Sequence, residues 1–158
     1  MRAFKTIALC AILASLSLGA AQAQAVDPKL VVIDARQSFM SLIAFYSAPL
    51  GAMDKGSMPY DAATASAAAN YIAALTSLDQ SGLWVEGTDR AYDESSLALP
   101  ALWEPAADLN GKIAALRDTS LALQAAAGTD LATMQAALAN LNGTCKACHG
   151  DYKFKPPK

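Results

Sequence analysis

The stretch DLATMQAALANLNGTCKACHGDY, residues 130–152, combines a helical pattern with a cluster of reactive side chains near the end of the chain. Its apolar positions recur every three or four residues, which is the spacing of one buried face of an α-helix. They are Leu131, Met134, Leu138, Leu141, Cys145, Cys148 and Tyr152. Both cysteines therefore fall on the buried stripe, and His149, the only histidine of the chain, follows them directly.

A first helix is expected far upstream. Asp27 and Pro28 form a typical helix start, because aspartate caps helix N-termini and proline fits the first turn. The apolar 3–4 spacing runs on to about Asp54, where the pair Lys55-Gly56 ends it. Pro49 should kink this helix or shorten it, because proline lacks the N–H that an interior helical position needs.

Two more helices are expected in the middle of the chain. An alanine-rich helix covers residues 61–78 behind Asp61, and a third runs from about residue 100 to 127. Pro105 and Gly111 weaken the start of the third helix, so its first turn can be separate. Residues 79–99 are an irregular surface loop. Four amphipathic helices with no alternating strand pattern predict an all-α, antiparallel up-down-up-down four-helix bundle.

Residues 1–25 have the layout of a secretory signal peptide. Arg2 and Lys5 precede a short apolar run, and small residues then offer cleavage after Ala23 or Ala25. The run is short for a retained membrane anchor, so we predict one exported domain of residues 26–158, free of the membrane after cleavage. Cleavage leaves 10 basic and 14 acidic residues, a net charge of −4, which argues against nucleic-acid binding.

The sequence CKACH, residues 145–149, is the attachment pattern of a c-type haem. Cysteines at positions i and i+3 share a helix face, so both sulfurs can bond one edge of a porphyrin. The histidine lies one turn beyond Cys145 and can reach the iron from the same side. We therefore predict one covalent haem c, attached through Cys145 and Cys148 and ligated by His149.

Three other interpretations of the two cysteines are weaker. A thioredoxin-like dithiol would stand in a βαβ setting, whereas this pair ends a fourth helix. A zinc site needs four ligands, and two cysteines with one histidine fall short. A disulfide between positions i and i+3 closes a very small loop and adds little stability.

Met40 is the candidate for the opposite side of the iron. The start of the first helix lies beside the end of the fourth in an up-down bundle, so Met40 can face His149 as a sixth ligand or a distal side chain. Met134 lies about 22 Å from His149 along the same helix, and Met53 belongs to the other end of the bundle. The alternative is that Met40 only fills the core.

Arg36 interrupts the apolar stripe one turn before Met40. A guanidinium in such a stripe needs an anionic partner, and a haem propionate would serve, with Gln37 adding a hydrogen bond. The alternative is an exposed arginine that pairs with Asp34 or with solvent.

Several short motifs resemble the class II c-type cytochromes, and most closely cytochrome c′. They cover nearly all of the mature chain and stand in the family's order. They are Arg36-Gln37, KGSMPY, WVEGT, ALPALW and CKACHGDYK. Leu109 departs from the pattern, because many members carry an aromatic residue there.

The resemblance implies a periplasmic four-helix bundle, often a homodimer through its first two helices. It implies a five-coordinate iron on His149 that binds nitric oxide or carbon monoxide, with Met40 packed over the open side and Arg36 and Gln37 on a propionate. Related low-spin members ligate the iron with a methionine at this position. Lys153 matches a basic position beside the proximal pocket.

The predicted function is one-electron transfer or diatomic gas binding, not catalysis. An enzyme such as a peroxidase would want a distal acid–base pair, which the sequence does not offer. A haem-free bundle with a chance CKACH is the remaining alternative. Lys146, Lys153, Lys155 and Lys158 gather at the expected haem end and could steer an acidic redox partner.

Overall fold

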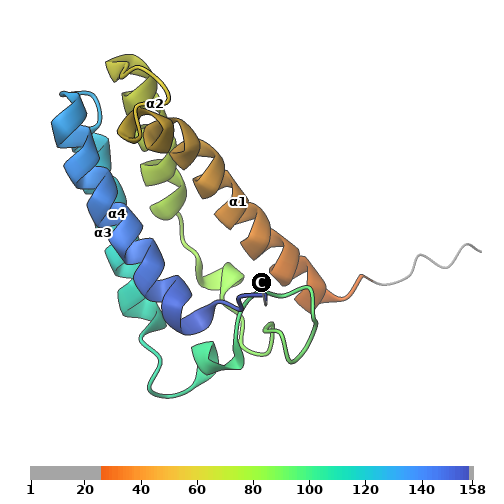
Figure 1. Ribbon diagram of the computed structural model, residues 1–158. Coiled ribbons are helices and arrows are strands. Elements are labelled where there is room, and N and C mark those ends of the chain that lie inside the picture. The colour runs from red at the N-terminus through yellow and green to blue at the C-terminus, as the bar shows by residue number, and fades with distance from the viewer. Residues whose placement is uncertain (1–25, 157–158) are drawn as a thin grey trace, which may run out of the picture.

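The computed structural model describes residues 26–156, and its long helices run alternately up and down (Figure 1). The predicted signal peptide, residues 1–25, and Lys158 lie outside the described residues. The helices are α1 (Pro28–Asp54), α2 (Ala62–Thr76), α3 (Leu109–Ala126) and α4 (Leu131–Tyr152), with 3₁₀ helices η1 (Ser81–Leu83) and η2 (Pro100–Trp103) between α2 and α3. The predicted all-α antiparallel bundle is confirmed.

Each of the four α-helices begins behind an aspartate. The carboxylates of Asp27, Asp61, Asp108 and Asp130 accept a hydrogen bond from a backbone N–H two or three residues ahead, at 2.7 to 3.1 Å. Each such cap contributes about 1 kcal/mol. In α4 the capping carboxylate of Asp130 accepts from Thr133 N.

The third helix does not run without a break from Pro100, and its expected first turn is separate. Pro100–Trp103 is a separate 3₁₀ turn, and α3 begins only at Leu109. Pro105 explains the break, because proline has no N–H to donate and pushes the residue before it out of helical geometry. Glu104 is accordingly extended, with φ −68° and ψ 149°. Pro49, in contrast, lies inside α1 without shortening it.

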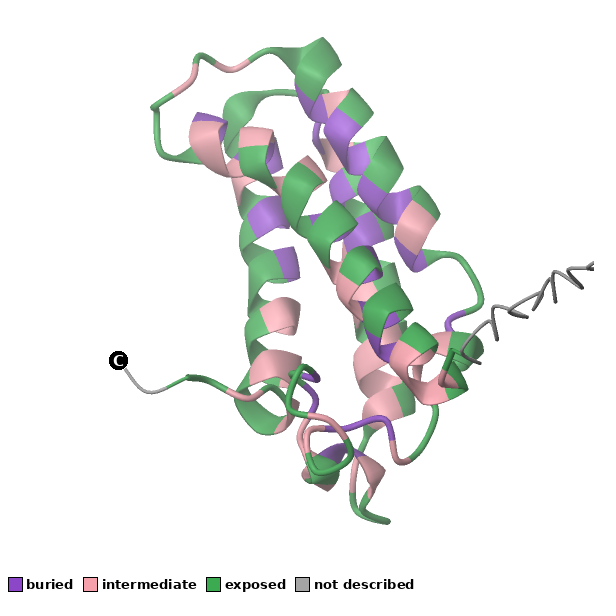
Figure 2. Cartoon of the chain, turned by 90° about the vertical axis from the view of Figure 1, so that its right-hand side faces the viewer, coloured by how far each residue is buried: buried purple, intermediate pink, exposed green. Residues whose placement is uncertain are grey.

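The hydrophobic core occupies the end of the bundle away from the long α2–α3 connection. Figure 2 shows buried residues concentrated there, while partly exposed residues predominate toward the other end. The core cluster includes large side chains from all four helices, among them Leu50, Met53, Ile72, Leu123, Met134 and Leu141, and α2 adds the small residues Ala65, Ala68 and Ala69. Alanine lets α2 approach its neighbours closely. Among the described residues, no helix has the length and apolarity needed to span a bilayer.

Candidate functional site

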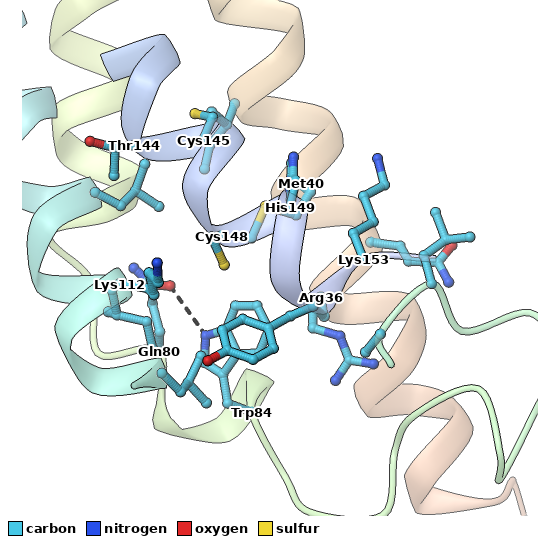
Figure 3. Close-up of a pocket in the computed structure, with 18 of the residues that line it drawn as sticks. Arg36, Met40, Gln80, Trp84, Lys112, Thr144, Cys145, Cys148, His149 and Lys153 are labelled. Carbon is cyan, nitrogen blue, oxygen red and sulfur yellow. Dashed lines mark hydrogen bonds between the residues drawn. The ribbon is translucent and has the colours of Figure 1, made fainter. Parts of the chain in front are cut away.

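A cavity of about 490 Å³ opens at the end of the bundle where α1 begins and α4 ends. Its volume falls within the range of small-molecule and cofactor sites. The walls are mostly apolar and come from α1, α3, α4 and the α2–α3 connection (Figure 3). They include Met40, Ile43, Trp84, Leu97, Leu102, Leu109, Ile113, Leu116 and Tyr152. The predicted site residues of α1 and α4 all line this one cavity.

Cys145, Cys148 and His149 stand on the last two turns of α4 and line the cavity (Figure 3). All three are half-buried, and Cys145 and Cys148 are not joined by a disulfide. Burial raises the pKa of the Cys145 thiol. Burial also raises the pKa of the Cys148 thiol, although the nearby ammonium group of Lys112 acts in the opposite direction. The apolar wall therefore favours uncharged sulfur, either as a thiol or as a thioether.

His149 is held in the form that binds metals. Burial lowers the pKa of its imidazole, and the ammonium groups of Lys153 and Lys155 lower it further. Both causes favour the neutral ring, whose lone pair can ligate iron. Among residues 26–156, no cluster of three or more histidine, cysteine or acidic side chains could hold a metal ion by itself.

Met40 lies on α1 and is half-buried in the cavity wall. Met53 and Met134 are instead at most 1% exposed in the core at the far end of the bundle. The structure thus brings Met40 and His149 to one cavity from two different helices. It leaves both roles for Met40 open, as sixth ligand or as a side chain packed over the site.

Arg36 is buried, with 5% of its surface exposed, so the expectation of a surface arginine paired with Asp34 is wrong. Its Nη1 donates to Leu83 O at 3.1 Å and to Thr88 Oγ1 at 2.8 Å. Its Nη2 donates to Thr88 O at 2.6 Å and to Ser96 Oγ at 3.1 Å. A guanidinium has five N–H donors, so four are committed to the α2–α3 connection and the Nε–H remains for another acceptor.

The neighbours of Arg36 were not identified from the sequence. Gln37 Nε2 donates to Ser95 O at 2.7 Å, so both residues of the Arg-Gln pair hold the same loop. Asp89 is buried close by, accepts a 2.7 Å hydrogen bond from Trp103 Nε1, and supports the charge of Arg36 electrostatically. The WVEGT motif lies in this loop, but no local sequence pattern predicted that the loop contacts Arg36.

The loop also places an aromatic ring on the cavity. Trp84 lines the wall, and its ring centroid lies 5.6 Å from the guanidinium carbon of Arg36. Its Nε1 donates a hydrogen bond to Gln80 Oε1 (Figure 3). Three residues later in the same motif, Gly87 has φ +73°, which favours glycine and permits the turn into Thr88.

The residues present fit a flat, apolar cofactor with an acidic edge. The walls are apolar, two neutral sulfurs and a neutral imidazole share one side, and Arg36 and Gln37 stand at one rim. A porphyrin matches these features, because its ring is apolar and its propionates are anionic.

Comparisons with known proteins agree with this chemistry. The sequence profile described as Cytochrome C′ matches residues 31–153. The chain belongs to the cytochrome c′ family of class II c-type cytochromes. It is 40% identical over 124 residues to a cytochrome c′ of Cereibacter sphaeroides, which covers 78% of this chain and 83% of the relative. A cytochrome c-554 of the same organism is 39% identical over 141 residues, 88% of this chain and 92% of the relative.

Solved structures of cytochromes c′ have the same fold. One from Rhodobacter spheriodes gives a TM-score of 0.78 at 38% identity and covers 81% of this chain and 98% of its own. A ferrous variant of the protein from Alcaligenes xylosoxidans, with bound nitric oxide, gives a TM-score of 0.70 at 31% identity, covering 84% and 100%. As a member of this family, the chain carries one covalently attached haem c.

Proposed function

We propose that this cytochrome c′ family member is a periplasmic haem protein that binds diatomic gases and exchanges single electrons. The observation that carries the proposal is the cavity shared by the CKACH turn of α4 and Met40 of α1. Haem iron supplies a one-electron redox couple and a coordination position for a small ligand. The protein supplies the attachment, the axial ligand and the shape of the open side.

In this proposal Cys145 and Cys148 attach the haem through thioethers, and His149 is the axial iron ligand. Their i, i+3 and i+4 spacing on α4 supports the assignment, since it directs all three toward one side of the cavity. The lowered pKa of His149 also supports it, because only the neutral imidazole can ligate. The remaining Nε–H of Arg36 and the amide of Gln37 stand at the rim that suits a haem propionate.

We favour a five-coordinate iron with Met40 packed over the open face. His149 is the only histidine of the chain, so a second imidazole cannot fill the distal position. One similar cytochrome c′ structure holds nitric oxide, and a structure of another variant holds carbon monoxide. The alternative is an electron carrier with a six-coordinate iron ligated by His149 and Met40. The position of Met40 in the wall of the same cavity supports this alternative.

The proposed function includes no substrate turnover. The distal candidate Met40 has no ionisable group, so it cannot act as the general acid or base that peroxide cleavage needs. A rate of peroxide consumption comparable to that of peroxidases, measured on purified holoprotein, would contradict this part of the proposal.

A homodimer would bury an exposed apolar face of α1 and α2. Leu42 and Phe45 of α1 are 45 and 69% exposed, Tyr71 of α2 is 54% exposed, and Leu78, just beyond the end of α2, is 61% exposed. Val31 continues the face on α1. The Phe45 and Tyr71 rings are linked through Tyr46, at centroid distances of 5.1 and 4.4 Å. A second copy of the chain is the partner we propose, because one self-complementary patch suffices for a two-fold dimer.

Basic side chains surround the haem end of this otherwise acidic protein. Lys146 and Lys155 border a shallow pocket beside His149, and Lys112 pairs with Asp151 at 3.4 Å. We expect these charges to attract an acidic redox partner in the periplasm, to which the predicted signal peptide would direct the protein. Oxidation by anionic ferricyanide should slow with rising ionic strength, whereas an unchanged rate would count against this attraction.

Optical spectra of the purified holoprotein test the proposed coordination. A high-spin ferrous spectrum that shifts readily with carbon monoxide is expected for an open iron. A low-spin ferric spectrum with a sulfur-to-iron band, resistant to carbon monoxide, would establish the six-coordinate alternative. Colourless protein from a host able to mature c-type cytochromes would overturn the assignment of the CKACH motif.

A further inference from the structure

A short segment of the α2–α3 connection, residues 95–99, lies between the two helices that face each other across the cavity. We call it the strap. On the α1 side, Gln37 Nε2 donates to Ser95 O at 2.7 Å, and Arg36 Nη2 donates to Ser96 Oγ at 3.1 Å. The strap is therefore attached to the helix turn directly before Met40.

The other side of the strap is attached to the end of α4. Leu99 N donates to Tyr152 O at 2.9 Å, and Phe154 N donates to Leu97 O at 2.8 Å. Ala98 and Lys153 form an isolated antiparallel bridge between these two hydrogen bonds. Figure 1 shows the connection and the C-terminal segment meeting at the open end of the bundle. The strap thus holds the turn directly after His149.

The strap is itself braced. Ser96 Oγ donates to Thr88 O at 2.9 Å, and Arg90 N donates to Ala98 O at 2.8 Å. The guanidinium of Arg90 lies 3.9 Å from the ring centroid of Phe154. Thr88 and Ser96 are fully buried, so water cannot readily replace these partners.

Both attachments stand about one helical turn from the residues that face the proposed iron. Met40 follows Arg36 by four residues, and Tyr152 follows His149 by three, which is roughly 5 to 6 Å along each helix axis. Residues of α1 and α4 line the cavity at this level, and the strap joins the two helices at its end through hydrogen bonds. The strap therefore connects the start of α1 to the end of α4.

We infer that the strap is a spacer that fixes the turn carrying Met40 relative to the turn carrying His149, with Arg36 and Ser96 as positioning residues. The part of the inference that concerns Met40 rests on the proposed five-coordinate iron. It explains why a thioether, a good ligand for haem iron, stays unbonded in the cavity wall. When the strap is loosened, α1 gains freedom, and Met40 gains access to the iron.

The test uses Ser96→Ala in the holoprotein, because this change leaves the charge of Arg36 and its remaining Nε–H in place. Ser120→Ala is the matched control, since Ser120 is also fully buried but donates within α3, to Leu116 O at 2.7 Å. The first measurement is hydrogen exchange at the amides of Leu99 and Phe154. We expect about tenfold faster exchange in Ser96→Ala, the effect of losing one buried hydrogen-bond partner, and no change in Ser120→Ala.

The second measurement is the ferric optical spectrum. Ser96→Ala should show a low-spin fraction that the wild type lacks, and the double variant Ser96→Ala/Met40→Leu should lose it again. Gln37→Ala provides a milder perturbation of the same attachment and should act in the same direction, so the test does not depend on one variant folding. Exchange and spectra that match the wild type in both strap variants would overturn the inference.

Failure of the proposed function gives a different result. A low-spin wild-type spectrum would refute the five-coordinate iron, but it would leave the exchange measurement unaffected. In that case the spacer is supported if Ser96→Ala still accelerates exchange at Leu99 and Phe154 and lowers the Met40-ligated fraction. It is refuted if neither property changes.

Discussion

Replacing Arg36 by methionine should destabilise the holoprotein substantially. The change keeps an unbranched side chain of similar length but removes four hydrogen bonds to Leu83, Thr88 and Ser96. Hydrogen bonds from a charged donor contribute about 1.5 to 3 kcal/mol each. Their full sum overstates the loss, because Ser96 Oγ still donates to Thr88 O, and Thr88 Oγ1 still donates to Val85 O at 2.6 Å.

Removing the buried charge of Arg36 offsets part of this loss of stability. Burial lowers the pKa of Arg36, which means that the folded protein pays a desolvation cost for this cation, reduced by the nearby Asp89 carboxylate. Methionine avoids that cost but leaves the partly buried carbonyl of Leu83 without this donor. We therefore expect a net loss of about 3 kcal/mol in the free energy of unfolding. For a domain of this size the midpoint should fall by about 10 °C.

Thermal and denaturant unfolding, followed by circular dichroism at the helix band, measure this loss. Arg117→Met is the control, because Arg117 is an exposed arginine in the middle of α3, and its replacement should change stability by about 0.5 kcal/mol or less. The loss in Arg36→Met should also shrink when Ser96→Ala is already present, since the two residues share a hydrogen bond. A loss below about 1 kcal/mol would refute the view that Arg36 holds the loop.

Three further predictions follow from other parts of the molecule. In the double variant Cys145→Ala/Cys148→Ala, acid–acetone should extract the haem that stays bound in the wild type; retention of haem through the extraction would contradict the thioether assignment. Phe45→Glu should convert a dimer to a monomer in sedimentation experiments while the folded chain keeps its helix content in circular dichroism, because Phe45 is 69% exposed; an unchanged sedimentation coefficient would exclude this face as the interface. Acid should weaken the helix caps, because capping hydrogen bonds lower the pKa of two aspartates. For Asp61 the largest cause is the hydrogen bond with the Thr64 side chain, followed by the one from the Thr64 backbone N–H. For Asp130 the largest cause is the hydrogen bond from the backbone N–H of Thr133. Since the folded-state pKa lies below the unfolded one, the stabilisation is complete above the ordinary aspartate value of about 3.9 and is lost as pH falls through the folded value. Asp61→Asn should therefore flatten the acid limb of the stability curve, and an unaltered slope would contradict the cap assignment.

The sequence determined the helices and the chemical identity of the site. Local periodicity places apolar stripes, aspartate caps begin the helices, and the CKACH spacing sets two cysteines and a histidine on one helix face. These features depend on residues at most four positions apart, which is why one sequence reveals them. The break between η2 and α3 was only half visible, because the pattern of leucines continues through a segment that Pro105 prevents from being helical.

Only the tertiary structure decided what Arg36 does. Its partners Thr88 and Ser96 lie 52 and 60 residues away, in a loop without periodicity, and no rule of local spacing links them. The same holds for the pairing of Leu97 and Leu99 with the end of α4, where backbone hydrogen bonds carry no signal in side-chain types. Helices and motifs arise from interactions within a few residues, whereas the width of the cavity between α1 and α4 depends on contacts that exist only after the chain has folded.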